Sequence, residues 1–169
     1  MTTKVLLLTT VLVYFREKIY KGLKKVFNHK EPEFRLDKQR KAVFIALDQQ
    51  TLLIIVLLTR GGKTLTFTLL AILRDPGVSI VVALFNTLEK NYVRRLWLAN
   101  IEHVVWHYKE TWYALVVMVS ADRAATTGFI TYRSMLRKRK LLRRVMFNKC
   151  YLLYTASDYR PKLWQLGHL

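Results

Sequence analysis

Hydrophobic positions along the chain alternate between two spacings, which predicts strands followed by helices. Residues 52–58 and 78–84 are continuous apolar runs, and runs of this kind are typical of strands covered on both faces. Each run is followed by apolar residues at helical spacing, at residues 65–73 and 87–98. This repetition predicts an α/β fold with a parallel sheet and helices on both faces.

The remaining pattern continues the same alternation. A helix is predicted at residues 34–47, where Asp37 is placed to cap it, and the turn Asp75-Pro76-Gly77 separates the first two strand–helix repeats. Further strands are predicted at residues 102–106, 115–119 and 145–147, with helices at residues 129–142 and 159–166.

Residues 1–33 form a separate N-terminal segment that ends near Pro32. Its apolar positions recur at helical spacing, which favours an amphipathic helix, and residues 16–30 are strongly basic. The positions are Leu8, Val11, Leu12, Phe15, Ile19 and Leu23. Three interpretations remain open: a helix packed on the domain, an anchor at a membrane surface, or a signal-like segment. The apolar run at residues 5–15 is too short to span a bilayer.

Composition adds a strong positive charge to this picture. The chain carries 29 Lys and Arg against 11 Asp and Glu, a net charge of +18. Such a balance indicates a polyanionic partner, either nucleic acid or an anionic membrane surface. The alternative is a chain that lost acidic residues without gaining a partner. Hydrophobic residues make up 52%, which argues against disorder.

Cysteine and histidine contribute little predicted chemistry. Cys150 is the single cysteine, so no internal disulfide forms and no disulfide-linked partner is expected; this usage fits a reducing compartment. His103 and His107 are four residues apart, but the segment between them has strand character and further ligands with zinc spacing are missing. We therefore expect no metal site at this pair.

The most informative stretch is Leu57-Leu58-Thr59-Arg60-Gly61-Gly62-Lys63-Thr64, which lies between a predicted strand and a predicted helix. Glycines let backbone N–H groups approach phosphate oxygens, and a helix N-terminus favours negative charge. Lys63 can reach terminal phosphates, and the Thr64 hydroxyl can ligate Mg²⁺. Gly-Lys-Thr alone occurs by chance, but this placement predicts a phosphate-binding loop.

Other short motifs follow in a recognisable order. They are Phe34-Arg35 with Gln39, the phosphate loop, Phe85-Asn86-Thr87-Leu88, Val119-Ser120-Ala121-Asp122-Arg123, Asn148-Lys149-Cys150-Tyr151 and Asp158-Tyr159-Arg160-Pro161. In this order and spacing, residues 34–169 resemble the first RecA-like domain of superfamily 2 (DEAD/DEAH-like) helicases. Within these, the segment is most similar to the RecQ-type DNA helicases of fungal repeat elements.

The resemblance implies a P-loop NTPase fold, ATP with Mg²⁺ as cofactor, DNA as partner and a nuclear location. It implies that Gln39 bonds the adenine while Phe34 and Arg35 stack near it. Phosphates would lie against Thr59, Gly61, Gly62, Lys63 and Thr64, with Thr64 on the metal. DNA contacts are implied for Asn86, Ser120, Arg123, Tyr159 and Arg160, and the family uses aromatic residues after the second box to sense single-stranded DNA.

Departures from the family pattern concern hydrolysis. Leu58 and Arg60 stand where the family's phosphate loop has proline and glycine, and Arg60 restricts a turn that suits glycine. Asn148 and Lys149 stand where the family has the magnesium-binding aspartate and the glutamate that activates water. Loss of a general base alone lowers rates by about 10²–10⁴-fold. Tyr151 replaces the histidine that couples hydrolysis to DNA, so we expect no ATP hydrolysis.

Each of these replacements can arise from a single C-to-T or G-to-A change. The same change converts an Arg codon into a Trp codon, which would account for Trp97, Trp112 and Trp164. This pattern suggests a helicase-like element altered by biased mutation. The sequence also ends before the rest of this domain and the second RecA-like lobe, so unwinding by this chain alone is not expected.

Two functions remain open from the sequence. The first is a catalytically inactive, nucleotide- and DNA-binding fragment of a RecQ-like helicase. The second is a non-enzymatic basic protein that binds nucleic acid or an anionic membrane through the basic helix at residues 133–140 and the segment at residues 5–15.

Overall fold

The structure is a computed structural model that describes residues 16–47, 62–73, 77–83, 86–108 and 111–147. Side chains within residues 86–88 are not part of this description. The chain divides into two compact units, Met1–Arg74 and Asp75–Leu169, which we call the N-terminal and C-terminal units. Each unit is described by itself. The expected boundary at residue 33 lies inside the N-terminal unit.

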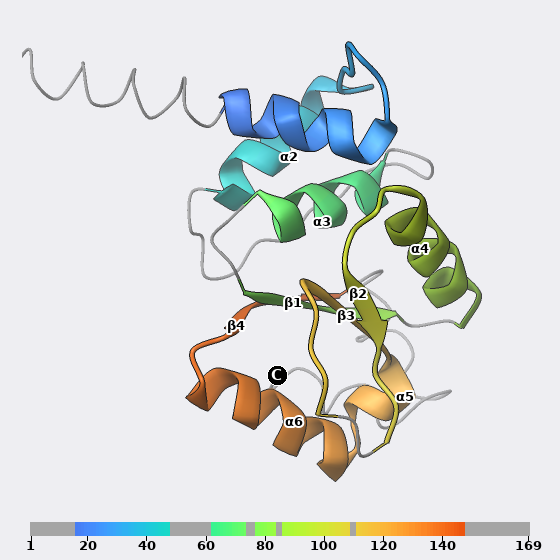
Figure 1. Cartoon of the computed structure of the whole chain (residues 1–169), viewed down its shortest axis with the longest axis vertical. Helices are drawn as coiled ribbons and strands as arrows, with labels where there is room; N and C mark the ends of the chain where they lie inside the picture. The colour runs from blue at the N-terminus through green and yellow to red at the C-terminus, as the bar shows by residue number, and fades with distance from the viewer. Residues whose placement is uncertain (1–15, 48–61, 74–76, 84–85, 109–110, 148–169) are drawn as a thin grey trace, which may run out of the picture. The chain divides into compact units, whose positions relative to one another are not determined.

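Three described helices make up the N-terminal unit (Figure 1): one at residues 16–27, α2 (Asp37–Leu47) and α3 (Lys63–Ile72). Ile19 and Leu23 of the first helix are buried, as their helical spacing predicts. Gly22 lets this helix approach the end of α3, because a Cβ there would lie 2.8 Å from Leu73 Cδ2. The helix predicted from residue 34 begins three residues later, at Asp37, which is its first residue rather than a preceding cap.

A four-stranded sheet forms the centre of the C-terminal unit. Its strands are β1 (Val78–Ala83), β2 (His103–Val105), β3 (Val116–Ser120) and β4 (Leu142–Phe147), in the order β2-β3-β1-β4. All three pairings are parallel. Every residue of β1 and β3 is buried, which agrees with their continuous apolar runs. The predicted α/β class with a parallel sheet is confirmed.

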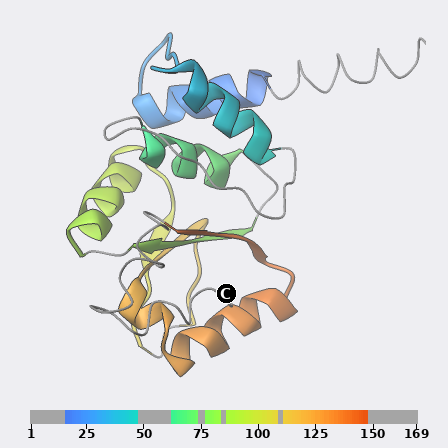
Figure 2. The same cartoon turned by 180° about the vertical axis from the view of Figure 1, so that it is seen from behind.

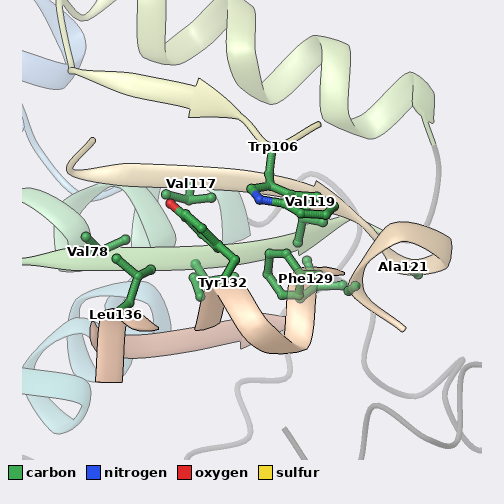
Figure 3. Packing of buried hydrophobic residues seen from close by; sticks show 11 residues of the cluster. Val78, Trp106, Val117, Val119, Ala121, Phe129, Tyr132 and Leu136 are labelled. Carbon is green, nitrogen blue, oxygen red and sulfur yellow. The ribbon is translucent and has the colours of Figure 1, made fainter. Parts of the chain in front are cut away.

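Helices cover both faces of this sheet (Figures 1 and 2). On one face lies α4 (Asn86–Leu98), and on the other lie the one-turn α5 (Ala121–Ala124) and α6 (Thr127–Lys138). Alternate residues of β1 and β3 point towards α6, where they pack on Trp106 and Phe129 (Figure 3). The rings of Trp106 and Phe129 meet edge-to-face, with centroids 5.1 Å apart.

The sequence placed the end of α6 wrongly. A helix was predicted at residues 129–142, but α6 ends at Lys138 and Leu142 already begins β4. Lys140 takes a left-handed conformation with φ 57°, and its N–H donates to the Arg137 carbonyl. The N–H of Leu141 then donates to Leu136, which closes the helix end. The strand predicted at residues 145–147 is correspondingly longer, and α5 was not predicted.

The connection from β2 to β3 contains no helix in its described part and runs beside α6. Trp106 donates its backbone N–H to Met118 of β3 and turns its side chain into the core. Further along, the Tyr132 hydroxyl of α6 donates to the carbonyl of Trp112 at 2.8 Å. A Cβ on Gly128 would lie 3.3 Å from the Tyr108 ring, so this glycine gives that ring room.

Several sequence predictions lie outside the described residues. They are the strand at residues 52–58, the first two residues of the turn Asp75-Pro76-Gly77 and the helix at residues 159–166. Across the described ranges, each helix is either too short or too polar to cross a membrane.

Candidate functional site

Gly62 forms the turn into α3. Its φ of 79° and ψ of 24° are left-handed, a conformation that glycine adopts without the steric penalty of a side chain. The Gly62 carbonyl accepts the N–H groups of Leu65 at 3.0 Å and Thr66 at 3.3 Å, which starts the helix. The sequence therefore supplies a glycine at the one described position of this loop that requires a positive φ.

The side chain of Gln39, in α2, forms a hydrogen bond with this turn. Its Nε2 donates to the Gly62 carbonyl at 3.0 Å, and its side chain is only 1% exposed. A Cβ on Gly62 would collide with Gln39 Nε2, so the contact itself requires glycine. The two residues are 23 positions apart, and the bond links two motifs that the sequence analysis assigned to one nucleotide site.

The other end of the same amide is a buried acceptor. Gln39 Oε1 has no hydrogen-bond partner within the described part of the chain. A buried amide oxygen without a partner is destabilising, and a ligand amino group can satisfy it. This is the chemistry by which a glutamine recognises an adenine ring.

Lys63 and Thr64 are the first two residues of α3, and both are half-buried. Helix geometry directs their backbone N–H groups away from the helix body, and the helix dipole adds partial positive charge at this end. The Lys63 side chain adds a full positive charge. Thr64 accepts the Thr68 hydroxyl on its carbonyl at 2.8 Å, a bond that leaves its own hydroxyl available to a ligand.

Phe34 and Arg35 lie in different surroundings from Gln39. Phe34 lines a groove of about 930 Å³ between the helix at residues 16–27 and α2, and Arg35 is exposed. Asp37, Arg40 and Phe44 line the same groove from α2. Gln39 instead lies on the buried face of α2 and bonds Gly62 of the loop before α3. The groove and the loop are thus separate features of the N-terminal unit.

Three of the five residues expected to contact DNA lie in the described part of the chain, at one edge of the sheet. Asn86 begins α4 just after β1, and Ser120 ends β3 and caps α5, which carries Arg123. Ala83 and Ser120 are register partners, so the carboxyl ends of these two strands are neighbours. Ligands of open α/β sheets bind at this edge. The structure therefore brings these three positions to one side of the C-terminal unit.

The remaining expected site residues lie outside the described ranges. They are Thr59, Gly61, Asn148, Lys149, Tyr151, Tyr159 and Arg160. Among the described residues, no cluster of three His, Cys, Asp or Glu side chains could hold a metal ion. His103 instead bonds the Ile101 carbonyl through Nδ1 at 2.7 Å.

The sequence predicted the basic residues of α6 but not the exposed aromatic residues between β2 and β3. Three exposed aromatic residues, Tyr108, Trp112 and Tyr113, lie between β2 and β3. Four exposed cations, Arg137, Lys138, Arg139 and Lys140, surround the C-terminal end of α6. The basic run was visible in the sequence, but its position beside the aromatic segment depends on how that segment packs. The sequence did contain a signal for the exposed aromatic segment: three aromatic residues occur within six positions and show neither strand nor helix spacing.

Comparison with protein-family models gives no match, and comparison with curated protein sequences gives none either. The function must therefore be argued from the residues and their geometry.

Proposed function

We propose that this chain carries a RecQ-like nucleotide-binding site that holds ATP without hydrolysing it. The observation that carries the proposal is the hydrogen bond from Gln39 Nε2 to the Gly62 carbonyl. It joins the residue implied to recognise adenine to the loop implied to hold the phosphates. The buried Gln39 Oε1 and the N-terminus of α3 supply complementary groups for a base and for phosphates.

In this proposal each residue has a distinct role. The N–H groups at the start of α3 and the ammonium of Lys63 bind phosphate oxygens, while the Thr64 hydroxyl takes one position on Mg²⁺. Gly62 keeps the turn open because a larger residue would collide with Gln39. The parallel sheet with helices on both faces is compatible with a RecA-like P-loop fold.

Absence of hydrolysis follows from the sequence of the second box. Asn148 offers a neutral amide oxygen where a carboxylate would bind Mg²⁺ strongly, and Lys149 cannot accept a proton from water at neutral pH. Lys149 also places a positive charge where the family has a negative one. Bound ATP would therefore remain intact.

Binding of a fluorescent ATP analogue to the full chain with Mg²⁺ tests the first part. Lys63→Ala removes a charged hydrogen bond of about 1.5–3 kcal/mol, so the affinity should fall about tenfold or more. Lys38→Ala is the matched control, because Lys38 is an exposed lysine on α2, and it should leave the affinity unchanged. Equal affinities for the parent and Lys63→Ala would overturn the proposal.

Phosphate release tests the second part. The parent chain should release no phosphate from ATP above the buffer rate. Measurable turnover that disappears in Lys63→Ala would show a hydrolytic site and contradict this part. The double substitution Asn148→Asp with Lys149→Glu restores the carboxylates, and tighter binding of ATP with Mg²⁺ in that variant would support the assignment of the second box.

A further inference from the structure

Three aromatic rings are exposed on the connection between β2 and β3. Tyr108 is 71% exposed, Trp112 is 79% exposed and Tyr113 is 48% exposed, although all three lie within six residues. Single exposed apolar residues are ordinary on protein surfaces, but a group of large rings is informative. Residues 107–113 contain no Ala, Val, Leu, Ile or Met, so their large apolar side chains are aromatic rings.

The segment is held against α6 at two points. The Trp112 carbonyl accepts the Tyr132 hydroxyl at 2.8 Å, and the Tyr108 ring lies over Gly128. Gly128 and Tyr132 are one helical turn apart, which places the two anchor points about 6 Å from each other along α6. The core beneath is rigid, because Tyr132 and Trp106 are buried and their rings pack together (Figure 3). The backbone at Trp112 and the ring of Tyr108 are therefore held against α6.

The same helix leads to a cluster of positive charge. Arg137, Lys138, Arg139 and Lys140 are exposed at its C-terminal end, about 8–12 Å beyond Tyr132 along the axis. Residues 123–147 contain no Asp or Glu, so no acidic side chain within this stretch neutralises the cluster. The exposed rings lie on the connection beside Gly128 and Tyr132, and the cations lie at the C-terminal end of the same helix; we call these two groups together the aromatic–basic surface.

We propose that the aromatic–basic surface binds single-stranded nucleic acid. Bases stack on exposed Tyr and Trp rings with little dependence on sequence, and Lys and Arg bind the phosphates of the same strand. A duplex fits poorly, because its bases are already stacked on each other. The cations of this surface precede β4, whose first residue pairs with the first residue of β1, so they lie away from the carboxyl edge that carries Asn86, Ser120 and Arg123. The proposal does not depend on nucleotide binding at α3.

Fluorescence anisotropy of a short dye-labelled oligothymidine with the full chain tests the role of the rings. Trp112→Ala should weaken binding at least about fivefold, and Tyr108→Ala should act in the same direction. Trp112→Ala keeps the carbonyl that Tyr132 bonds, so the segment stays anchored. Trp97→Ala is the matched control, because Trp97 is 71% exposed at the end of α4, and it should leave binding unchanged. If the exposed tryptophans are only products of biased mutation, Trp112→Ala and Trp97→Ala will have the same affinity for the oligothymidine. That result would overturn the proposal.

Salt dependence and competition test the role of the cations and the choice of ligand. Replacing Arg137, Lys138, Arg139 and Lys140 together by Gln should make the fall of log affinity with log salt less steep. An unlabelled single strand should compete better than a duplex of the same sequence. Equal competition by the duplex, or binding to anionic phospholipid vesicles in place of the oligonucleotide, would overturn the proposal. Lys63→Ala should bind the oligonucleotide like the parent, which keeps this result separate from the nucleotide site.

Discussion

The side-chain amide of Gln39 donates to the backbone carbonyl of Gly62 at 3.0 Å, and this bond joins α2 to the first turn of α3. The Gly62 carbonyl also accepts two N–H groups of α3 itself. The same oxygen therefore makes the first hydrogen bonds of α3 and the hydrogen bond to α2. Changes at either residue should therefore alter the stability of the N-terminal unit in a coupled way. All four tryptophans belong to the C-terminal unit, so their fluorescence follows the unfolding of that unit.

Gly62→Ala should destabilise the N-terminal unit by more than about 1–2 kcal/mol. The left-handed conformation alone costs an L-residue about that much, and the new methyl group also collides with Gln39 Nε2. Urea unfolding followed by far-UV circular dichroism measures the change. In a Gln39→Ala background the collision is gone, so the same substitution should cost only the conformational part. If Gly62→Ala lowers the free energy of unfolding equally in both backgrounds, the close contact between Gly62 and the Gln39 side chain is contradicted.

Thr126→Ala should destabilise the C-terminal unit by about 0.5–2 kcal/mol, because Thr126 is the N-cap of α6. Its hydroxyl accepts the Phe129 N–H at 3.3 Å and donates to the Arg123 carbonyl at 2.7 Å, which also ties α6 to α5. Thr127→Ala, one residue later and exposed, is the control and should change stability little. Tryptophan fluorescence during urea unfolding measures both variants.

Tyr132→Phe should destabilise the C-terminal unit by about 0.5–1.5 kcal/mol and loosen the segment around Trp112. The substitution removes only the hydroxyl that bonds the Trp112 carbonyl and leaves the buried ring in place. Hydrogen exchange of the amides near residue 112 should become faster, while β1 remains protected. Tyr20→Phe is a control with the same kind of bond, from Tyr20 to the Lys30 carbonyl at 3.1 Å, in an exposed position. Its effect on stability should be smaller.

Phe129→Ala should destabilise the C-terminal unit by about 3–5 kcal/mol, because a fully buried ring is lost and a cavity remains. The neighbouring Ile130 on the same helix is 41% exposed, so Ile130→Ala should destabilise the unit much less than Phe129→Ala does. Urea unfolding monitored by tryptophan fluorescence compares them. A small effect at Phe129 would show that this core does not stabilise the unit.

The sequence predicted those elements well whose ends follow from burial, and it predicted poorly those whose ends follow from backbone conformation. β1 and α4 were found with nearly correct ends, because burial on both sides gives a continuous apolar run and one-sided burial gives helical spacing. The end of α6 was missed, because it depends on Lys140 in a left-handed conformation, which lysine seldom adopts and no glycine signalled. Charge and helix propensity both favoured a longer helix there.

The site was predictable to a similar degree. Gly62, Lys63 and Thr64 follow from a local motif, and the structure places them at a helix N-terminus. The bond between Gln39 and Gly62 depends on how two helices pack, which a linear pattern does not contain. The aromatic–basic surface was missed for the same reason, since Trp112 meets α6 through a backbone carbonyl rather than through its ring. The roles of Asn148 and Lys149 stay predictions.

The order of the strands also has a consequence for synthesis on the ribosome. β1 lies in the middle of the sheet, but both of its neighbours, β3 and β4, come later in the chain. Its six buried residues therefore emerge before any strand that can pair with them. Non-local pairing of this kind slows folding and leaves apolar segments open to aggregation. We expect a nascent chain that stops before β4 to depend on chaperones, whereas one that includes β4 can complete the sheet around β1.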